Sequence, residues 1–180
     1  MNWTPRVARA ADIPALEDLI PLSVRALQAA YYSPAQMDAA IGPIFGVDHQ
    51  LIADGTYFVV EHEGRVIGCG GWSKRKSICG SGPAGEGADT ELDPQNDPAR
   101  IRAFFVHPSW ARRGIGRSIL AACESAIVAA GFPRAELLAT LAGEPLYAAF
   151  GYAVIKRYDL MMANDLPLPV VLMARQLRPN

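Results

Sequence analysis

The segment from 101 to 120 constrains the fold of this chain more than any other. It opens with Ile101–Val106, which is apolar apart from one arginine and rich in strand-forming residues. The strand must end before Pro108, because proline has no N–H for a strand ladder. A helix then starts near Gly114 and runs to Gly131, since apolar residues recur at helical spacing between them. This succession of strand, loop and helix predicts a sheet with helices packed on it.

The loop before this helix has the composition of an anion-binding site. It combines Gly114 and Gly116 with Arg112, Arg113 and Arg117. The first amides of a helix have no partner within it, the helix dipole is positive there, and glycine lets an anion approach the main chain. The pattern therefore predicts a phosphate or pyrophosphate site. For the loop taken alone, a tight turn with solvated arginines is the alternative.

The order of these parts resembles the acetyl-CoA-binding segment of the GNAT superfamily of N-acetyltransferases. That segment is an apolar strand, a loop written Gln/Arg-x-x-Gly-x-Gly/Ala and an amphipathic helix. Gly114 and Gly116 match the loop, whereas Ala111 occupies its leading Gln/Arg position. The resemblance rests here on the backbone amides, which need no particular side chain.

A second match follows a predicted strand over 135–140. Residues 141–152 resemble a short helix of the same family, in which a tyrosine stands four residues before a pair of glycine and an aromatic residue. Tyr147, Gly151 and Tyr152 fall on those positions. Both motifs occur in the family's order, and the resemblance covers most of the chain.

The resemblance implies an α/β (α+β) fold. The expected sheet is mixed and mostly antiparallel, has six to seven strands flanked by helices, and is splayed after the fourth strand. Acetyl-CoA is the implied co-substrate, with its pantetheine arm in the splay. The residues that the resemblance assigns to it are Phe104, Phe105, Val106, Arg112, Arg113, Gly114, Ile115, Gly116, Arg117 and Ser118.

The family's reaction also implies residues that handle protons. Tyr147 is the expected general acid for the leaving thiolate, and a core tyrosine bonded to a backbone carbonyl is the alternative. Leu138 stands where many members carry a basic glutamate. Glu136 shares a strand face with it and is the expected substitute, while His62, His107 and a chain of waters stay open as general bases.

The acceptor site is less defined by the sequence. Tyr31 and Tyr32 lie between the first helices, a region that forms one wall of the acceptor site in the family, although they could also pack over the core. Arg100 and Arg102 share a strand face and could meet an acidic part of the acceptor or pair with nearby acids.

The implied activity is acetyl-CoA-dependent N-acetyl transfer to a primary amine, directly within a ternary complex. The alternative is a non-catalytic acyl-CoA-binding module on the same fold. Homodimers are common in the family, so a homodimer is consistent with the resemblance.

Composition narrows the partners. A chain of 180 residues, about half of them apolar, suits one domain over 1–180. The net charge of −1 argues against a nucleic-acid binder or an anionic membrane surface. The sequence has neither a signal-peptide pattern nor a bilayer-length apolar run, so a cytoplasmic protein is expected. Cys69, Cys79 and Cys123 are widely spaced, which favours reduced thiols and no metal site.

A long flexible loop is predicted over 74–98, which is dense in Gly, Pro, Asp and Ser. Gly80–Gly85 within it matches the GxGxxG pattern of dinucleotide-binding proteins. That motif needs an apolar strand before it and a helix after it, and neither is predicted here. We therefore expect no flavin or nicotinamide cofactor. The loop is expected to be solvated or to act as a lid over the acceptor site.

The remaining elements follow from local patterns. Pro21 should bend or break the first helix, so that 23–30 forms a second piece. Ser33 and Gln36 form a predicted capping box with Pro34 at the first helical position. The other predicted elements are strands over 6–9, 56–62, 65–72, 152–160 and 169–175, and helices over 12–20, 34–41 and 48–53.

Overall fold

A computed structural model describes residues 2–76 and 90–177. They form a seven-stranded sheet in the order β1-β2-β3-β4-β5-β7-β6, in which only β4 and β5 pair in parallel. The strands are β1 (Arg6–Val7), β2 (Tyr57–His62), β3 (Arg65–Ser73), β4 (Ala99–Val106), β5 (Arg134–Thr140), β6 (Ala153–Met161) and β7 (Pro167–Gln176). The predicted mixed, mostly antiparallel sheet is confirmed.

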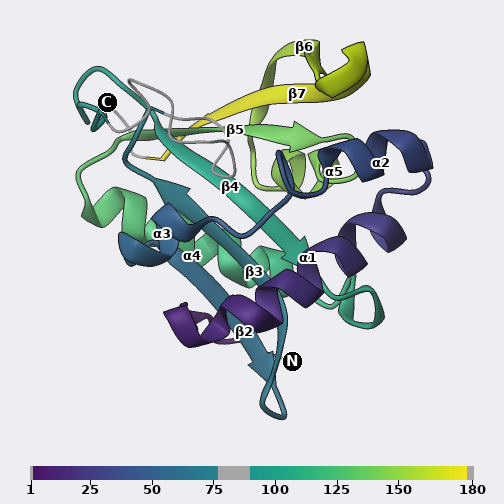
Figure 1. The fold of residues 1–180 in the computed structure, drawn as a ribbon. Helices are drawn as coiled ribbons and strands as arrows, with labels where there is room; N and C mark the ends of the chain where they lie inside the picture. Colours follow the sequence, from purple (N-terminus) through teal and green to yellow (C-terminus); the bar gives the residue numbers. More distant parts are fainter. Residues whose placement is uncertain (1, 77–89, 178–180) are drawn as a thin grey trace.

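The helices lie on both faces of this sheet. They are α1 (Ile13–Leu27), α2 (Pro34–Ala40), α3 (His49–Ala53), α4 (Ile115–Ala129) and α5 (Glu144–Ala149), with short 3-10 helices at Ala10–Asp12, Pro108–Trp110 and Ala163–Asp165. Figure 1 shows α1, α2 and α3 in front of the sheet and α4 behind it. Each face therefore carries its own hydrophobic core.

The core behind the sheet depends on a close contact between α4 and β3. Ile115, Ile119, Leu120 and Ile127 of α4 are at most 1% exposed there. A Cβ at Gly68 would lie 2.4 Å from Cγ2 of Ile115, so only glycine allows this approach. The start of α4 is thereby fixed against the sheet.

The core in front of the sheet is built on the apolar face of α1. Leu16, Leu19, Ile20 and Val24 are at most 3% exposed. The predicted break at Pro21 is wrong, because α1 continues through it to Leu27. Proline removes one intrahelical hydrogen bond, and the burial of this face against β3 and β4 outweighs that loss.

The sheet splits between β4 and β5. Their pairing covers Ala99 to Ile101 opposite Ala135 to Leu137, and Figure 1 shows the two strands separating beyond that point. Beyond the split, β5 stays paired with β7 as far as Thr140. The predicted splay after the fourth strand is confirmed.

A β-bulge marks the split on the side of β4. Cys69 pairs with Phe105 and Gly71 with Arg102, so Gly70 alone lies opposite two residues of β4. One of these two is Ala103, whose φ of 62° is in the left-handed region. Its carbonyl oxygen leaves the ladder and accepts a hydrogen bond of 3.1 Å from the buried Tyr57 hydroxyl.

The predicted capping box of α2 is confirmed by two hydrogen bonds. Gln36 N donates to Ser33 Oγ at 3.2 Å and Ser33 N to Gln36 Oε1 at 2.9 Å, which completes the capping box of α2. The hairpin between β2 and β3 turns at Glu63 and Gly64, whose φ values are 49° and 75°.

The segment predicted as a loop is described only in part. Its two ends run antiparallel, since Leu92 N donates to Lys74 O and Lys76 N to Thr90 O. Leu92 is 6% exposed and belongs to the core behind the sheet. The GxGxxG match at Gly80–Gly85 lies outside the described residues.

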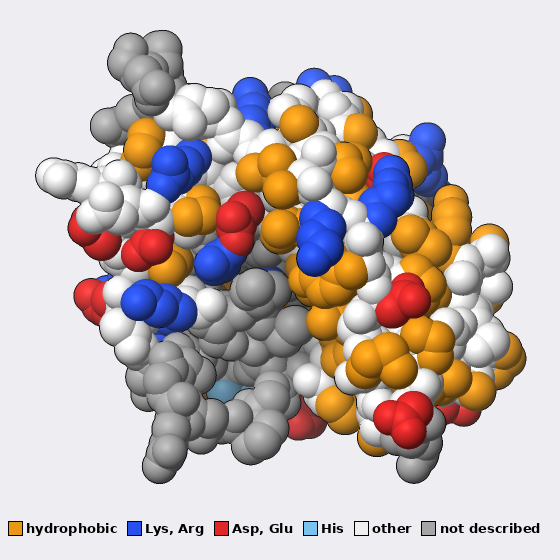
Figure 2. All heavy atoms as spheres, turned by 90° about the horizontal axis from the view of Figure 1, so that it is seen from above, with side chains coloured by type: hydrophobic (Ala, Val, Ile, Leu, Met, Phe, Trp, Pro, Cys, Tyr) orange, Lys and Arg blue, Asp and Glu red, His pale blue; other side chains and the backbone are white. Residues whose placement is uncertain are grey.

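The edge strand β6 is largely exposed. Val154, Ile155 and Met161 are 43%, 62% and 62% exposed. Figure 2 shows hydrophobic side chains gathered on the side of the molecule where β6 and β7 lie in Figure 1. This side contrasts with the charged surface on the opposite side of the same view.

We expect Tyr57→Phe to lower the free energy of unfolding by about 1–2 kcal/mol, because the partly buried carbonyl of Ala103 loses its hydroxyl donor and keeps only the weaker thiol donor of Cys69, whose sulfur lies 3.9 Å away. Urea denaturation measures the change. Tyr158→Phe on the edge strand is the control and should change stability by less than about 0.5 kcal/mol. Equal effects of the two substitutions would contradict the role given to the Tyr57 hydroxyl.

Candidate active site

A cavity of about 690 Å³ occupies the place where β4 and β5 separate. It reaches from the start of α4, across the free end of β4, to α1 and the segment between α2 and α3. Its lining residues include Arg112, Gly114, Ile115, Gly116, Arg117, Leu146 and Tyr147 on one side, Arg102 to Val106 of β4, and Ser23, Gln28, Tyr31 and Asp48 on the other.

The N-terminus of α4 forms one end of the cavity. Gly114 precedes the helix with a φ of 85°, which favours glycine. The amide of Ser118 donates to the Gly114 carbonyl at 3.0 Å, so the amides of the three residues between them precede the first intrahelical bond. A Cβ at Gly116 would meet Leu146 at 3.1 Å. These amides and the helix dipole can hold an anion.

The loop before α4 is held by the N-terminal segment. Trp3 Nε1 donates to the carbonyl of Arg113 at 2.7 Å, across 110 positions of sequence. The Trp3 ring packs edge-on against Trp110, and the Arg113 guanidinium lies 4.9 Å from the centre of the Trp110 ring. Arg113 is therefore directed away from the cavity, unlike Arg112 and Arg117, which line it.

The backbone at the end of β4 alternates between the ladder and the cavity. His107 N donates to Ile67 O at 2.9 Å, so the main-chain groups of Phe105 face β3 and those of Val106 face the opening. Val106 N donates to Ser23 Oγ of α1 at 3.1 Å. The amide of Val106, one of the residues assigned to acetyl-CoA, thus points into the opening and is hydrogen-bonded to the Ser23 hydroxyl.

Tyr147 lies beside this strand end. Its ring packs edge-on against Phe104, with centroids 5.9 Å apart, and lines the cavity while being only 7% exposed. Burial raises the pKa of the Tyr147 phenol well above its ordinary value, and the nearby Cys123 thiol raises it further. The phenol is therefore protonated at neutral pH, as a proton donor must be.

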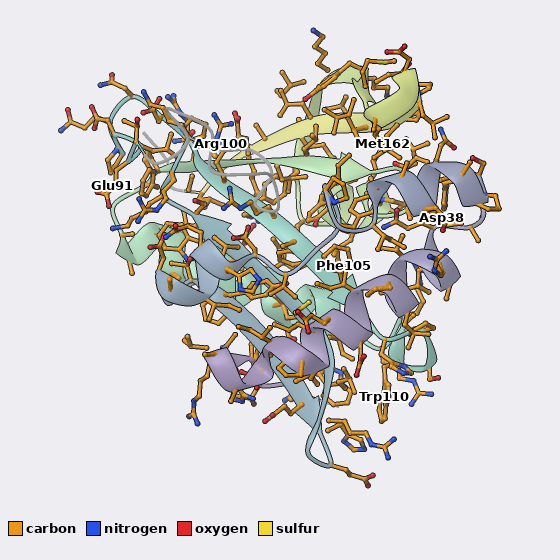
Figure 3. The ribbon with its side chains drawn as sticks, viewed as in Figure 1. Asp38, Glu91, Arg100, Phe105, Trp110 and Met162 are labelled. Carbon is orange, nitrogen blue, oxygen red and sulfur yellow. The ribbon has the colours of Figure 1, made fainter. Side chains whose placement is uncertain are left out.

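Glu136 does not reach the cavity. It forms an ion pair with Arg100 where β4 and β5 are still paired. Figure 3 shows Arg100 and Phe105 toward opposite ends of β4. This position does not support the expected role of Glu136 as general base. The pairing of β4 with β5 ends at Leu137, so Glu136 lies within the paired part, whereas Leu138 lies beyond it and lines the cavity.

The two candidate histidines also lie outside the cavity lining. The His62 ring packs against Trp3 and Trp110, with its centroid 4.5 Å from that of Trp110. His107 Nδ1 accepts from the amide of Ser109 at 3.2 Å. Both side chains therefore contact the segment between β4 and α4.

The two tyrosines expected at the acceptor wall have different positions. Tyr31 is 50% exposed and lines the cavity. Tyr32 is 3% exposed; its hydroxyl donates to Pro169 O at 2.7 Å and accepts from Leu141 N at 3.0 Å. Tyr32 thus connects the helical segment to β7 and to the end of β5 without lining the cavity.

Most of the residues predicted to bind acetyl-CoA come together. The exceptions are Arg113 and Ser118, which do not line the cavity. Ser118 Oγ donates to the Ile115 carbonyl at 2.8 Å. Those that line it are Phe104, Phe105, Val106, Arg112, Gly114, Ile115, Gly116 and Arg117.

Sequence reasoning missed a polar group on the opposite wall. Arg102 Nε donates to Asp48 Oδ2 at 2.7 Å, and these side chains are 8% and 1% exposed. Asp48 also caps α3 through the amide of Leu51 at 3.1 Å. Gln28 and Ser23, which are 7% and 4% exposed, complete the set. The pairing of Arg102 with an acid was one of two predicted outcomes, but its partner lies 54 positions away and has no local signal.

The described residues contain no group of three or more His, Cys, Asp or Glu side chains that could hold a metal ion. Within the same residues, no helix has the length and apolar character needed to cross a membrane. Cys69 and Cys123 are fully buried, and burial raises the pKa of Cys69 to about 12.

Comparisons with known proteins agree on one family. Residues 53–154, more than half of the chain, match the family model described as an acetyltransferase (GNAT) domain. This range contains β4, the loop, α4 and Tyr147. No curated protein sequence matches the chain.

Solved structures with the same fold span nearly the whole chain. A GCN5-related N-acetyltransferase from Rhodopseudomonas palustris is 19% identical with a TM-score of 0.72, over 98% of this chain and 96% of that one. YncA from Salmonella typhimurium, solved with acetyl-CoA, is 18% identical with a TM-score of 0.67, over 100% and 96%. PaiA N-acetyltransferase from Thermoplasma acidophilum, solved with coenzyme A, is 13% identical with a TM-score of 0.65, over 98% and 99%.

At these identities the likeness of structure shows the fold, and the family model adds the sequence match over the site itself. The chain belongs to the GNAT family of acetyltransferases.

Proposed function

We propose that this protein is an acetyl-CoA-dependent N-acetyltransferase that moves the acetyl group directly to a primary amine within a ternary complex. One observation carries the proposal: a single cavity joins the free amides of α4, the open end of β4 and the protonated phenol of Tyr147. An anion site, a strand edge and a proton donor are the parts that acetyl transfer needs.

The proposed position of acetyl-CoA follows from the chemistry of each wall. The pyrophosphate would bind the amides at the start of α4, with Arg112 and Arg117 adding positive charge. The pantetheine arm would lie in the opening, where β4 has main-chain groups without a partner strand. The coenzyme-bound structures of PaiA and YncA support this choice of ligand.

The thioester would lie against the end of β4. There Val106 N–H and the Ser23 hydroxyl that accepts it form a hydrogen-bonded pair. The hydroxyl keeps its own proton as a donor. Donors fixed before the reaction stabilise the oxyanion of the tetrahedral intermediate, an effect worth about 3–4 kcal/mol for one donor in comparable sites.

The proposed reaction forms one bond and breaks one. The nitrogen lone pair of the neutral amine attacks the acetyl carbonyl carbon and forms the C–N bond. The C–S bond then breaks, and its electron pair leaves with sulfur. The amine nitrogen loses one proton to solvent, and the Tyr147 hydroxyl gives one to the thiolate, after which the phenol is reprotonated from solvent.

Direct transfer is favoured over an acyl-enzyme. Cys69 and Cys123 are buried and do not line the cavity, so neither described cysteine can attack the thioester. Cys79 lies outside the described residues. Since direct transfer requires acetyl-CoA and the amine to be bound at the same time, the reaction would take place in a ternary complex.

Calorimetric titration with acetyl-CoA tests the binding half of the proposal. We expect Gly116→Val to weaken binding at least about tenfold, because a branched side chain would crowd Leu146 and cover the amides. Ser125→Val, on the exposed face of the same helix, is the matched control and should leave affinity unchanged. Similar affinities in both variants, or no binding by the wild type, would count against the site.

Kinetics of Tyr147→Phe test the catalytic half. We expect kcat to fall about a hundredfold while the affinity for acetyl-CoA is kept, since only the proton donor is lost. An unchanged kcat would show that another group protonates the thiolate. If no wild-type turnover is found with any amine although acetyl-CoA binds, the non-catalytic binding module becomes the better description.

The pH dependence follows from the direction of the Tyr147 pKa. Because burial raises this pKa above the ordinary value of about 10, the phenol should stay protonated and competent up to about pH 10. The kcat of the wild type should therefore show no loss from this group between about pH 7 and 10. A decline over that range that disappears in Tyr147→Phe would contradict the assignment.

A further inference from the structure

The cavity has a second half beyond the free end of β4, and its chemistry differs from that of the α4 end. Apolar side chains from α1, from the segment between α2 and α3, and from β6 and β7 dominate it: Leu27, Ile44, Phe45, Leu160, Leu168 and Val170. The arginines Arg112 and Arg117 lie at the other end. A ligand in this half is selected by apolar contact together with a few polar groups.

Gln28 is a polar residue of this half whose side-chain hydrogen bonding is not satisfied by the described residues. It caps the C-terminus of α1, lines the cavity and is only 7% exposed. Its Oε1 atom has no hydrogen-bond partner among the described residues. A buried acceptor without a donor costs about 1–3 kcal/mol, so a ligand that brings an N–H group would recover that energy.

The charges of this half are already balanced. Arg102 and Asp48 form an ion pair of 2.7 Å and are nearly fully buried. The carboxylate of an acceptor would lose its hydration here. It would also be repelled by the Asp48 carboxylate, which already pairs with Arg102, the only cation among the described residues that line this half. An acceptor without a carboxylate avoids both costs.

Resting on the proposed function, we propose that the acceptor is a compact primary amine with an apolar body and no carboxylate, whose N–H donates to Gln28 Oε1. The volume of about 690 Å³ is shared with the reactive end of acetyl-CoA, which limits the acceptor to a small molecule or one small side chain. The bond to Gln28 holds the nitrogen so that its lone pair can face the thioester.

Three amines that share one aromatic group test the class on the wild-type protein. The probes are 2-phenylethylamine, phenylalanine and phenylalaninamide, assayed by thiol release from acetyl-CoA. We expect kcat/KM for 2-phenylethylamine to exceed that for phenylalanine by at least about a hundredfold. Phenylalaninamide has the bulk without the charge, so it should recover most of the rate. A rate for phenylalanine equal to or above that for 2-phenylethylamine would overturn the inference.

Two substitutions test the role of Gln28. Gln28→Met keeps the length of the side chain without the oxygen and should raise KM for 2-phenylethylamine about tenfold, with a smaller change in kcat. Gln28→Asn keeps an amide oxygen without adding a charge and should give a KM between those of the wild type and Gln28→Met. A purely structural role would instead change the melting temperature and the KM for acetyl-CoA in both variants. An unchanged amine KM in Gln28→Met would refute the contact.

The outcomes separate this inference from the function on which it rests. Binding of acetyl-CoA without thiol release from any amine would overturn both. Thiol release that favours phenylalanine would overturn the acceptor class and leave N-acetyl transfer standing. Should a Gln28 variant fail to fold, the comparison of the three amines on the wild type still decides the class.

Discussion

The structure depends on the point at which β4 and β5 stop pairing. Up to Ile101 and Leu137 they form a parallel ladder, and beyond it each keeps only its other neighbour. A sheet opened in this way exposes main-chain groups that must find partners. The bulge turns the Ala103 carbonyl toward Tyr57, and α1 supplies Ser23 to the amide of Val106. Side chains from β2 and α1 thus form the hydrogen bonds that the opened end of β4 would otherwise lack. The cavity lies between α1, this strand end and the start of α4.

The parts of the fold that follow from local patterns were predictable from the sequence. The strand before Pro108, the helix after Gly114 and the capping box of α2 each have a cause within a few residues. The free amides at the N-terminus of α4 were also predictable, because they require only the start of a helix and a glycine before it. Tyr147 was identified because the residues around it resemble a family motif, and in the structure it lines the cavity.

What the sequence could not predict depends on contacts between distant segments. Glu136 and Leu138 are two residues apart, and only the register of β5 decides which of them meets the cavity. Tyr31 and Tyr32 are adjacent, yet one lines the cavity and the other binds β7. The helix continues through Pro21 because burial outweighs a local penalty. The partner of Arg102 comes from 54 positions away, which no periodicity could indicate.

A crystal structure of the protein with acetyl-CoA tests the central claim most directly. The claim is that the split between β4 and β5 exists to hold this ligand. We expect the pantetheine arm in the split, the pyrophosphate within hydrogen-bond distance of the amides from Gly114 to Arg117, and the thioester between Val106 and Tyr147. Acetyl-CoA bound elsewhere, or a split closed by pairing of β4 with β5, would contradict the account.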